Sequence, residues 1–164
     1  MHIRKSEIKD LPAILEIYES SRKFMRVRGN PTQWSDEYPS QSIVEGDVAR
    51  GVGFVCVDGE QILAAFYFAV ESDASYARID GAWLDDSEYG VIHRLARAKN
   101  GKKAAEFCID WCLAKAGNIR IDTHKNNKPM LSLLERLGFD YCGIIRLVDT
   151  DFDNERLAFQ KRLR

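Results

Sequence analysis

Residues 91–123 decide the fold, and they read VIHRLARAKNGKKAAEFCIDWCLAKAGNIRIDT. The largely apolar stretch 91–98 predicts a strand, and a helix is predicted from about Lys103 to Ala116, where Gly117 ends it. Residues 119–123 predict a second strand. A strand, a helix and a strand in this order favour a parallel strand pair inside a mixed sheet.

Hydrophobic periodicity and turn residues predict the elements on either side of this segment. Helices are expected after Asp10, after Pro39-Ser40 and between Asn127 and Gly138. Strands are expected at 2–4, 52–57, 61–70, around 76–80, at 139–148 and at 155–162. We therefore expect an α/β protein with one mixed α+β sheet, the order β-αα-βββ-α-β-α-ββ, and a single domain over residues 1–164.

Composition excludes several classes of protein. The chain has 24 basic and 25 acidic residues, so no nucleic-acid partner is expected. The longest apolar run, Ile62–Val70, is shorter than the about 20 residues that a membrane span needs, so no membrane association is expected. The first residues lack the apolar core of a signal peptide, which predicts a cytoplasmic location. The scattered cysteines and three histidines have no metal-ligand spacing, so no metal is expected.

A site for a phosphate-bearing ligand is predicted after the first of the two central strands. The free N–H groups at the start of a helix bind anions, and Lys99, Lys102 and Lys103 add positive charge at that point. The second strand leads into His124 at the edge where open α/β sheets place ligands. The polar segment 125–128 opens the next helix.

Asn127, followed by Leu137-Gly138-Phe139, resembles the segment N-x-x-A-x-x-x-Y-x-x-x-G-F of the GNAT superfamily of N-acetyltransferases. The resemblance extends over essentially the whole chain. It implies that acetyl-CoA is the cosubstrate and lies in a V-shaped gap between strands 91–98 and 119–124. The implied cofactor-binding residues are Leu95, Ala96, Arg97, Asn100, Gly101, Lys102, Lys103, Ala104, Ala105 and Asn127.

The pyrophosphate loop departs from the family pattern (Q/R)-x-x-G-x-(G/A), because only Ala105 matches it. Lys103 replaces the glycine that lets the phosphate approach the backbone. Its ammonium group could bind the phosphate instead, or its side chain could block the site. The family's general acid, a tyrosine, falls at Leu134, and Tyr141 is a possible substitute.

The candidate catalytic residues are thus Tyr141 as the acid and His93 or His124 as the base. An imidazole with a pKa near 6.5 accepts a proton readily at neutral pH. Each histidine could instead have a structural role, and a water chain could serve as the base. Asp122 could orient His124, and Arg120 is an equally good partner for that carboxylate.

The acceptor is expected to be a small-molecule or peptide amine. By the resemblance, the loop between the first two helices forms a wall of its pocket, which makes Trp34 and Tyr38 candidates for substrate binding. Asp85, in the acidic run with Asp86 and Glu88, could attract a cationic amine. The plainer alternatives are core aromatic residues and a solvated loop.

These observations favour a cytoplasmic acetyl-CoA-dependent N-acetyltransferase, with a homodimer as a possible assembly. The altered loop and the missing tyrosine keep an alternative open, namely a catalytically weak or inactive domain that binds acyl-CoA or a protein partner.

Overall fold

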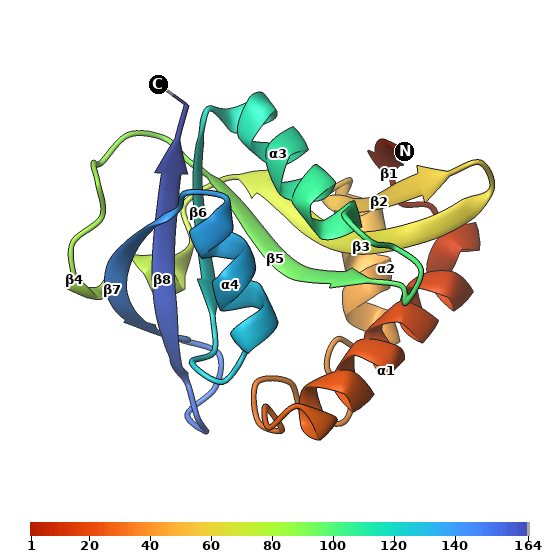
Figure 1. Cartoon of the computed structure of the whole chain (residues 1–164), viewed down its shortest axis with the longest axis horizontal. Helices are drawn as coiled ribbons and strands as arrows, with labels where there is room; N and C mark the ends of the chain where they lie inside the picture. Colours follow the sequence, from red (N-terminus) through yellow and green to blue (C-terminus); the bar gives the residue numbers. More distant parts are fainter. Residues whose placement is uncertain (164) are drawn as a thin grey trace. The chain divides into compact units, whose positions relative to one another are not determined.

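The computed structural model describes residues 1–163 and shows a mixed sheet with four helices (Figure 1). The helices are α1 (Leu11–Val27), α2 (Gln41–Arg50), α3 (Ala104–Ala116) and α4 (Lys128–Arg136). The strands are β1 (His2–Lys5), β2 (Gly53–Asp58), β3 (Gln61–Val70), β4 (Ile79–Gly81), β5 (Gly90–Arg97), β6 (Asn118–Thr123), β7 (Asp140–Arg146) and β8 (Glu155–Arg162). The short 3-10 helices Ile8–Asp10 and Ala74–Tyr76 precede α1 and β4.

The chain divides into two compact units. The N-terminal unit comprises Met1–Ala69 and Ile92–Trp111, and the C-terminal unit comprises Val70–Val91 and the chain from Cys112 onward. Strands pair in the order β1-β2-β3-β5 in the first unit and β5-β6-β8-β7-β4 in the second. Strand β5 occurs in both because the chain passes from one unit to the other after Val91.

The predicted parallel pair is confirmed, since Gly90 pairs with Ile119 and Val91 with Arg120. The hairpins β2–β3 and β7–β8 are antiparallel, as expected. The expected order is wrong in one respect, because four strands and not three lie between α2 and α3. The short strand expected around 76–80 is nevertheless present as β4, which has three residues and pairs with β7, and the expected order left it out.

The core of the N-terminal unit forms where one face of α1 packs on the sheet. Leu11, Ile14 and Tyr18 recur at helical spacing and are buried with Val55 and Ala65 of the β2–β3 hairpin. Local signals set the ends of α2. The Ser40 side chain accepts a hydrogen bond from the Ile43 N–H, and Gly51 ends the helix in the left-handed conformation.

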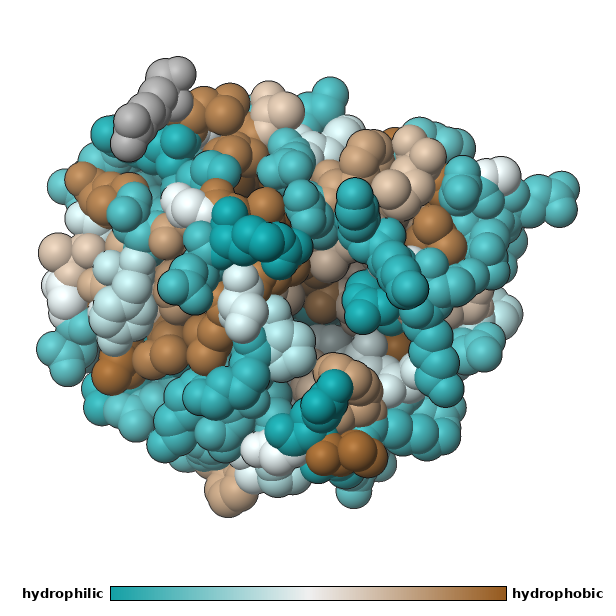
Figure 2. Space-filling model, viewed as in Figure 1, coloured by the Kyte–Doolittle hydropathy of each residue, from teal (hydrophilic) through white to brown (hydrophobic). Residues whose placement is uncertain are grey.

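In the C-terminal unit, β6 and β7 both pair with β8. Helix α4 starts at the Asn127 cap, carries Pro129 in its first turn and has Leu134 fully buried. Hydrophilic side chains cover much of the face shown in Figure 2, with apolar patches between them. None of the helices in residues 1–163 has the length and apolar character to cross a membrane.

Candidate functional site

The loop that follows β5 is held by backbone hydrogen bonds. The Ala98 N–H donates to the Leu63 carbonyl oxygen of β3 at 2.8 Å, and the Gly101 N–H donates to the Ala98 carbonyl oxygen at 3.0 Å. The Ala104 N–H then donates to the Gly101 carbonyl oxygen at 3.0 Å, where α3 begins. The loop therefore leads directly into a helix N-terminus, whose first N–H groups lack intrahelical acceptors and favour an anion.

Gly101 lies against the backbone of β3. A Cβ atom at this position would lie 2.5 Å from the Leu63 carbonyl oxygen and 3.2 Å from the Ala98 carbonyl oxygen. Both atoms belong to the backbone and cannot rotate away. Glycine is therefore required here for steric reasons, and the sequence pattern alone did not reveal this.

Lys103 has the backbone conformation of a glycine. Its φ angle is +68°, in the left-handed region that L side chains rarely adopt. This is the position at which the GNAT pattern has glycine, so the loop keeps the glycine-type backbone although the residue has changed. The side chain is exposed, as are those of Lys99 and Lys102, so the loop carries three solvated positive charges.

Lys103→Gly is expected to stabilise the fold by about 1 kcal/mol, because it removes the steric cost of a left-handed non-glycine residue. The measurement is urea unfolding monitored by circular dichroism. Lys102→Gly is the matched control, at a neighbouring position without a positive φ, and it should give no gain in the free energy of unfolding. An equal effect of the two substitutions would contradict this account of Lys103.

The middle of β5 is irregular. Arg94 has a φ angle of +54°, which interrupts the extended strand just before Leu95–Arg97. Of these three residues, Ala96 is buried and Arg97 is exposed, with its guanidinium donating to the Ala98 carbonyl oxygen at 3.2 Å. His93 is half-buried, and its ring centroid lies 5.5 Å from that of Tyr67.

The Arg94 side chain is the centre of a buried polar cluster in the N-terminal unit. Its Nη2 atom donates to Asp47 Oδ2 at 2.6 Å, and its Nη1 atom lies 3.4 Å from the Tyr38 hydroxyl oxygen. The guanidinium also lies over the Tyr67 ring, 5.0 Å from its centroid. Burial disfavours the charge, but Tyr38 and Asp47 favour it more strongly and raise the pKa of Arg94 above its ordinary value.

The aromatic candidates from the α1–α2 loop join this cluster. The Trp34 ring is buried and meets the rings of Tyr18 and Tyr38 edge-on, at 5.7 Å and 5.9 Å between centroids. The structure thus places Trp34 in the core and Tyr38 between the core and Arg94. Sequence reasoning missed Asp47 and Arg94. The contacts of Arg94 come from the α1–α2 loop, α2 and β3, which are far apart in the sequence.

Both ring nitrogens of His124 are engaged in the C-terminal unit. The Nδ1 atom accepts a hydrogen bond from the Asn126 N–H at 3.1 Å, so the proton resides on Nε2, which lies 2.8 Å from Asp153 Oδ2. The ring is only 2% exposed. Both nitrogens are thus committed to contacts within the protein, and this arrangement favours a structural role.

The remaining candidates in the C-terminal unit contact other residues of the same unit. Asn127 caps α4, with its Oδ1 atom accepting from the Met130 N–H at 3.3 Å. Tyr141 is 57% exposed, and its ring packs against Phe159. Asp122 accepts a hydrogen bond from the Tyr76 hydroxyl at 2.7 Å, a partner that neither sequence alternative named.

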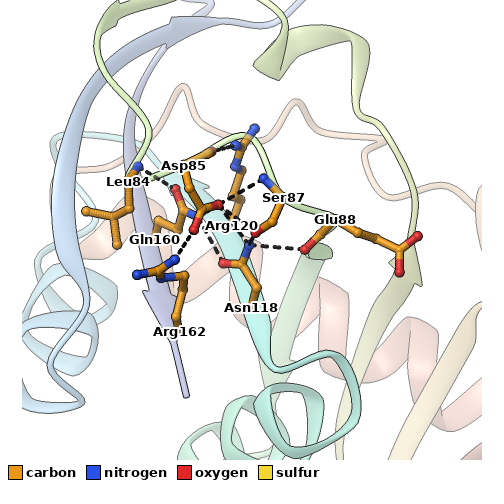
Figure 3. A network of polar contacts seen from close by, with 8 residues as sticks. All are labelled: Leu84, Asp85, Ser87, Glu88, Asn118, Arg120, Gln160 and Arg162. Atoms are coloured by element: carbon orange, nitrogen blue, oxygen red, sulfur yellow. Dashed lines mark hydrogen bonds and ion pairs between the residues drawn. The ribbon is translucent and has the colours of Figure 1, made fainter. Parts of the chain in front are cut away.

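Asp85 belongs to a network of polar contacts (Figure 3). The network connects the segment before β5 with Asn118 of β6 and Gln160 of β8. Its carboxylate forms an ion pair with Arg162 and accepts from the Ser87 N–H and hydroxyl at 3.1 Å and 2.7 Å. The hydroxyl of Ser87, together with Arg162, lowers the pKa of Asp85. Gln160, which is fully buried, also donates to it. The Asp85 charge is therefore already neutralised within the protein.

The predicted site residues fall into two sets. The N-terminal unit holds Trp34, Tyr38, His93, Leu95–Arg97 and Asn100–Ala105, and the C-terminal unit holds Asp85, His124, Asn127 and Tyr141. Within residues 1–163, no group of three or more His, Cys, Asp and Glu side chains is placed to hold a metal ion. The four cysteines are all buried, with free thiols.

Comparison with known proteins gives structural matches only. No protein-family model matches the sequence, and a search of curated proteins finds no match. A GNAT-family acetyltransferase from Streptococcus agalactiae is 25% identical, with a TM-score of 0.86 and coverage of 99% of this chain and 95% of that one. A protein from Staphylococcus aureus assigned as an acetyltransferase is 26% identical, with a TM-score of 0.71 and full coverage of both chains.

A more distant match is a GNAT phosphinothricin acetyltransferase from Sinorhizobium meliloti, whose structure holds AcCoA. It is 14% identical, with a TM-score of 0.64 and coverage of 99% of this chain and 88% of that one.

Proposed function

We propose that this chain, which has the fold of the GNAT-family acetyltransferases, is an acetyl-CoA-dependent N-acetyltransferase acting on a primary amine. The observation that carries the proposal is the match to a GNAT-family acetyltransferase over 99% of the chain at a TM-score of 0.86. The left-handed backbone at Lys103 supports it, because the loop keeps the conformation that the family's glycine supplies.

The N-terminal unit would hold the cosubstrate. The N–H groups at the start of α3 would bind the pyrophosphate, with Lys102 and Lys103 supplying positive charge. The backbone of Leu95–Arg97, just after the irregular Arg94, would bind the pantetheine arm. An N–H group of this segment would polarise the thioester carbonyl in the manner of an oxyanion hole. In the C-terminal unit, Asn127 is the proposed cofactor-binding residue, and it caps the start of α4.

When bound, acetyl-CoA supplies the acetyl thioester that the amine attacks. The C–N bond forms and the C–S bond breaks, and the CoA thiolate leaves with the electron pair of that bond. A thiol with a pKa near 8.5 leaves without strong acid assistance. Tyr141 is the proposed acid because it is exposed and lies in β7, shortly after the helix in which Leu134 is buried.

His93 is the proposed base. Its ring is half-buried on β5, one residue before Arg94 and two before the Leu95–Arg97 segment proposed to bind the pantetheine arm. An amine with a lysine-like pKa near 10 is protonated at pH 7, so a base must accept its proton before or during attack.

The test of the proposal is calorimetric titration of the protein with acetyl-CoA, with CoA and ATP as comparison ligands. We expect micromolar binding of acetyl-CoA, followed by CoA release in the presence of an amine acceptor. No binding up to millimolar concentration would contradict the proposal.

His93→Gln is expected to lower kcat by about a hundredfold, because general base catalysis contributes about 10²–10⁴. The Kd of acetyl-CoA should stay unchanged. His2→Gln, on an exposed position of β1, is the matched control and should retain full activity. His124→Gln should lower stability instead, since it breaks the bond to Asp153 or the bond to Asn126. If His93→Gln does not change kcat, His93 is not the base, and a water chain is the alternative that accepts the proton.

A second candidate function is a catalytically weak domain that binds acyl-CoA. Two substitutions favour it, namely Lys103 in place of glycine and the buried Leu134 in place of tyrosine. Acetyl-CoA binding without turnover on any amine would identify this function. Cytoplasmic location and a homodimer are further parts of the proposal, and sedimentation equilibrium of the purified protein tests the assembly.

A further inference from the structure

The Arg94 guanidinium has hydrogen-bonding capacity that the protein does not use. Its side chain is 12% exposed, and its Nε atom is buried without a hydrogen-bond partner. The Nη1 atom lies 3.4 Å from the Tyr38 hydroxyl, which is a long contact. A buried donor without a partner is unfavourable, so the protein holds the Nε atom of Arg94 in an arrangement that is incomplete by itself.

The surroundings of Arg94 carry an excess of positive charge. Arg50 Nη2 lies 3.4 Å from Asp47 Oδ1, and Arg22 Nη1 donates to the Tyr38 carbonyl oxygen at 3.1 Å. Three guanidinium groups are thus held around Tyr38 and Asp47, of which Arg50 and Arg94 share the Asp47 carboxylate and Arg22 interacts with Glu19. The Asp47 carboxylate is itself 8% exposed and already binds two of the three.

The geometry points to an anionic partner at Arg94. A guanidinium donates charge-assisted hydrogen bonds to a carboxylate, and Asp47 binds only Nη2, which leaves Nε and Nη1 as the open donors. Arg94 also lies next to the backbone segment Leu95–Arg97, which the proposed function places at the acetyl group. The acidic residue expected to attract a cationic amine, Asp85, is neutralised by Arg162 in the C-terminal unit.

We propose that Arg94 binds a carboxylate of the acceptor, so that the acceptor is an amino acid or another amine that carries a carboxylate group, and not a polyamine. This inference rests on the proposed function and names the substrate class for it. Arg94 is then a specificity-determining residue, and Asp47, which binds the Nη2 atom of the guanidinium, is a positioning residue.

The experiment compares acceptors that differ only in the carboxylate. CoA release is measured with acetyl-CoA and each of the common L-amino acids, the corresponding amino acid amides, and spermidine. We expect kcat/KM to be at least about tenfold higher for an amino acid than for its amide, in keeping with a charge-assisted hydrogen bond. Equal use of the acids and the amides, or a preference for spermidine, would overturn the inference.

Arg94→Lys keeps the charge beside Asp47 and removes the planar fork. We expect it to lower the acid-to-amide ratio by about tenfold through the KM of the acceptor, with the Kd of acetyl-CoA unchanged. Arg146→Gln, an exposed ion-paired arginine on β7, is the control and should leave the ratio unchanged. A ratio that Arg94→Lys does not alter would overturn the inference.

Two further measurements separate instability and failure of the proposed function from failure of this inference. Arg94→Gln leaves Asp47 buried without its partner, so the double substitution Arg94→Gln/Asp47→Asn is the variant to compare, after circular dichroism has verified its fold. It should lose the preference for acids.

If acetyl-CoA does not bind, the proposed function fails. Calorimetric titration of the protein with amino acids and their amides then decides the inference alone, with tighter binding of the acids supporting it and equal binding overturning it. Binding of acetyl-CoA without acetylation of any amino acid would overturn this inference and leave cofactor binding intact.

Discussion

Lys103→Glu is expected to weaken acetyl-CoA binding by about ten- to fiftyfold at low ionic strength, because it reverses a charge beside the pyrophosphate site. The ammonium of Lys103 stands at the loop residue directly before α3 begins at Ala104. A carboxylate there would oppose both the phosphate and the positive end of the helix dipole. Isothermal titration calorimetry of the two proteins with acetyl-CoA measures the ratio of Kd values.

Lys9→Glu is the matched control, since it changes the net charge equally at an exposed lysine outside the loop. It should leave the Kd nearly unchanged. The difference between the two variants should shrink at higher salt, because the charges are solvated. Tighter binding by Lys103→Glu or by Lys103→Gly would instead show that the lysine blocks the site, which was the other interpretation of this position.

Gly101→Ala is expected to destabilise the protein by about 2–3 kcal/mol, because the added methyl group overpacks a backbone contact. The Cβ atom would lie 2.5 Å from the Leu63 carbonyl oxygen, so the loop must move away from β3. That movement also shifts the backbone of the proposed pyrophosphate site. We therefore expect weaker acetyl-CoA binding together with a lower midpoint of urea unfolding.

Gly46→Ala provides the opposite control. Gly46 lies within α2, and an added Cβ atom meets nothing within 4 Å there. Replacing glycine by alanine inside a helix stabilises it by about 0.5–1 kcal/mol. Destabilisation by Gly101→Ala no greater than the effect of Gly46→Ala would show that the contact with Leu63 is not restrictive.

The helices, the hairpins and the parallel pair could be predicted because their signals are local. Ser40 and Gly51 bound α2, and Asn127 with Gly138 bounds α4, through contacts within a few residues. The fold class also followed from the order of elements and from the resemblance of the segment 127–139. The short strand predicted around 76–80 is present as β4 at 79–81, and its bounds are set by pairing with β7, more than 60 residues later.

In the candidate site, too, some features follow from the local sequence and others depend on tertiary contacts. The sequence by itself placed the phosphate loop before α3, because a lysine-rich turn and a helix start are adjacent along the chain. The tertiary structure alone placed Arg94 against Asp47, engaged both nitrogens of His124, paired Asp122 with Tyr76 and committed Asp85 to Arg162. Apart from the bond between His124 and Asn126, these contacts join residues that are distant in the chain. Spacing encodes only which residues share a helix or strand face, whereas packing decides which distant partners neutralise a buried charge.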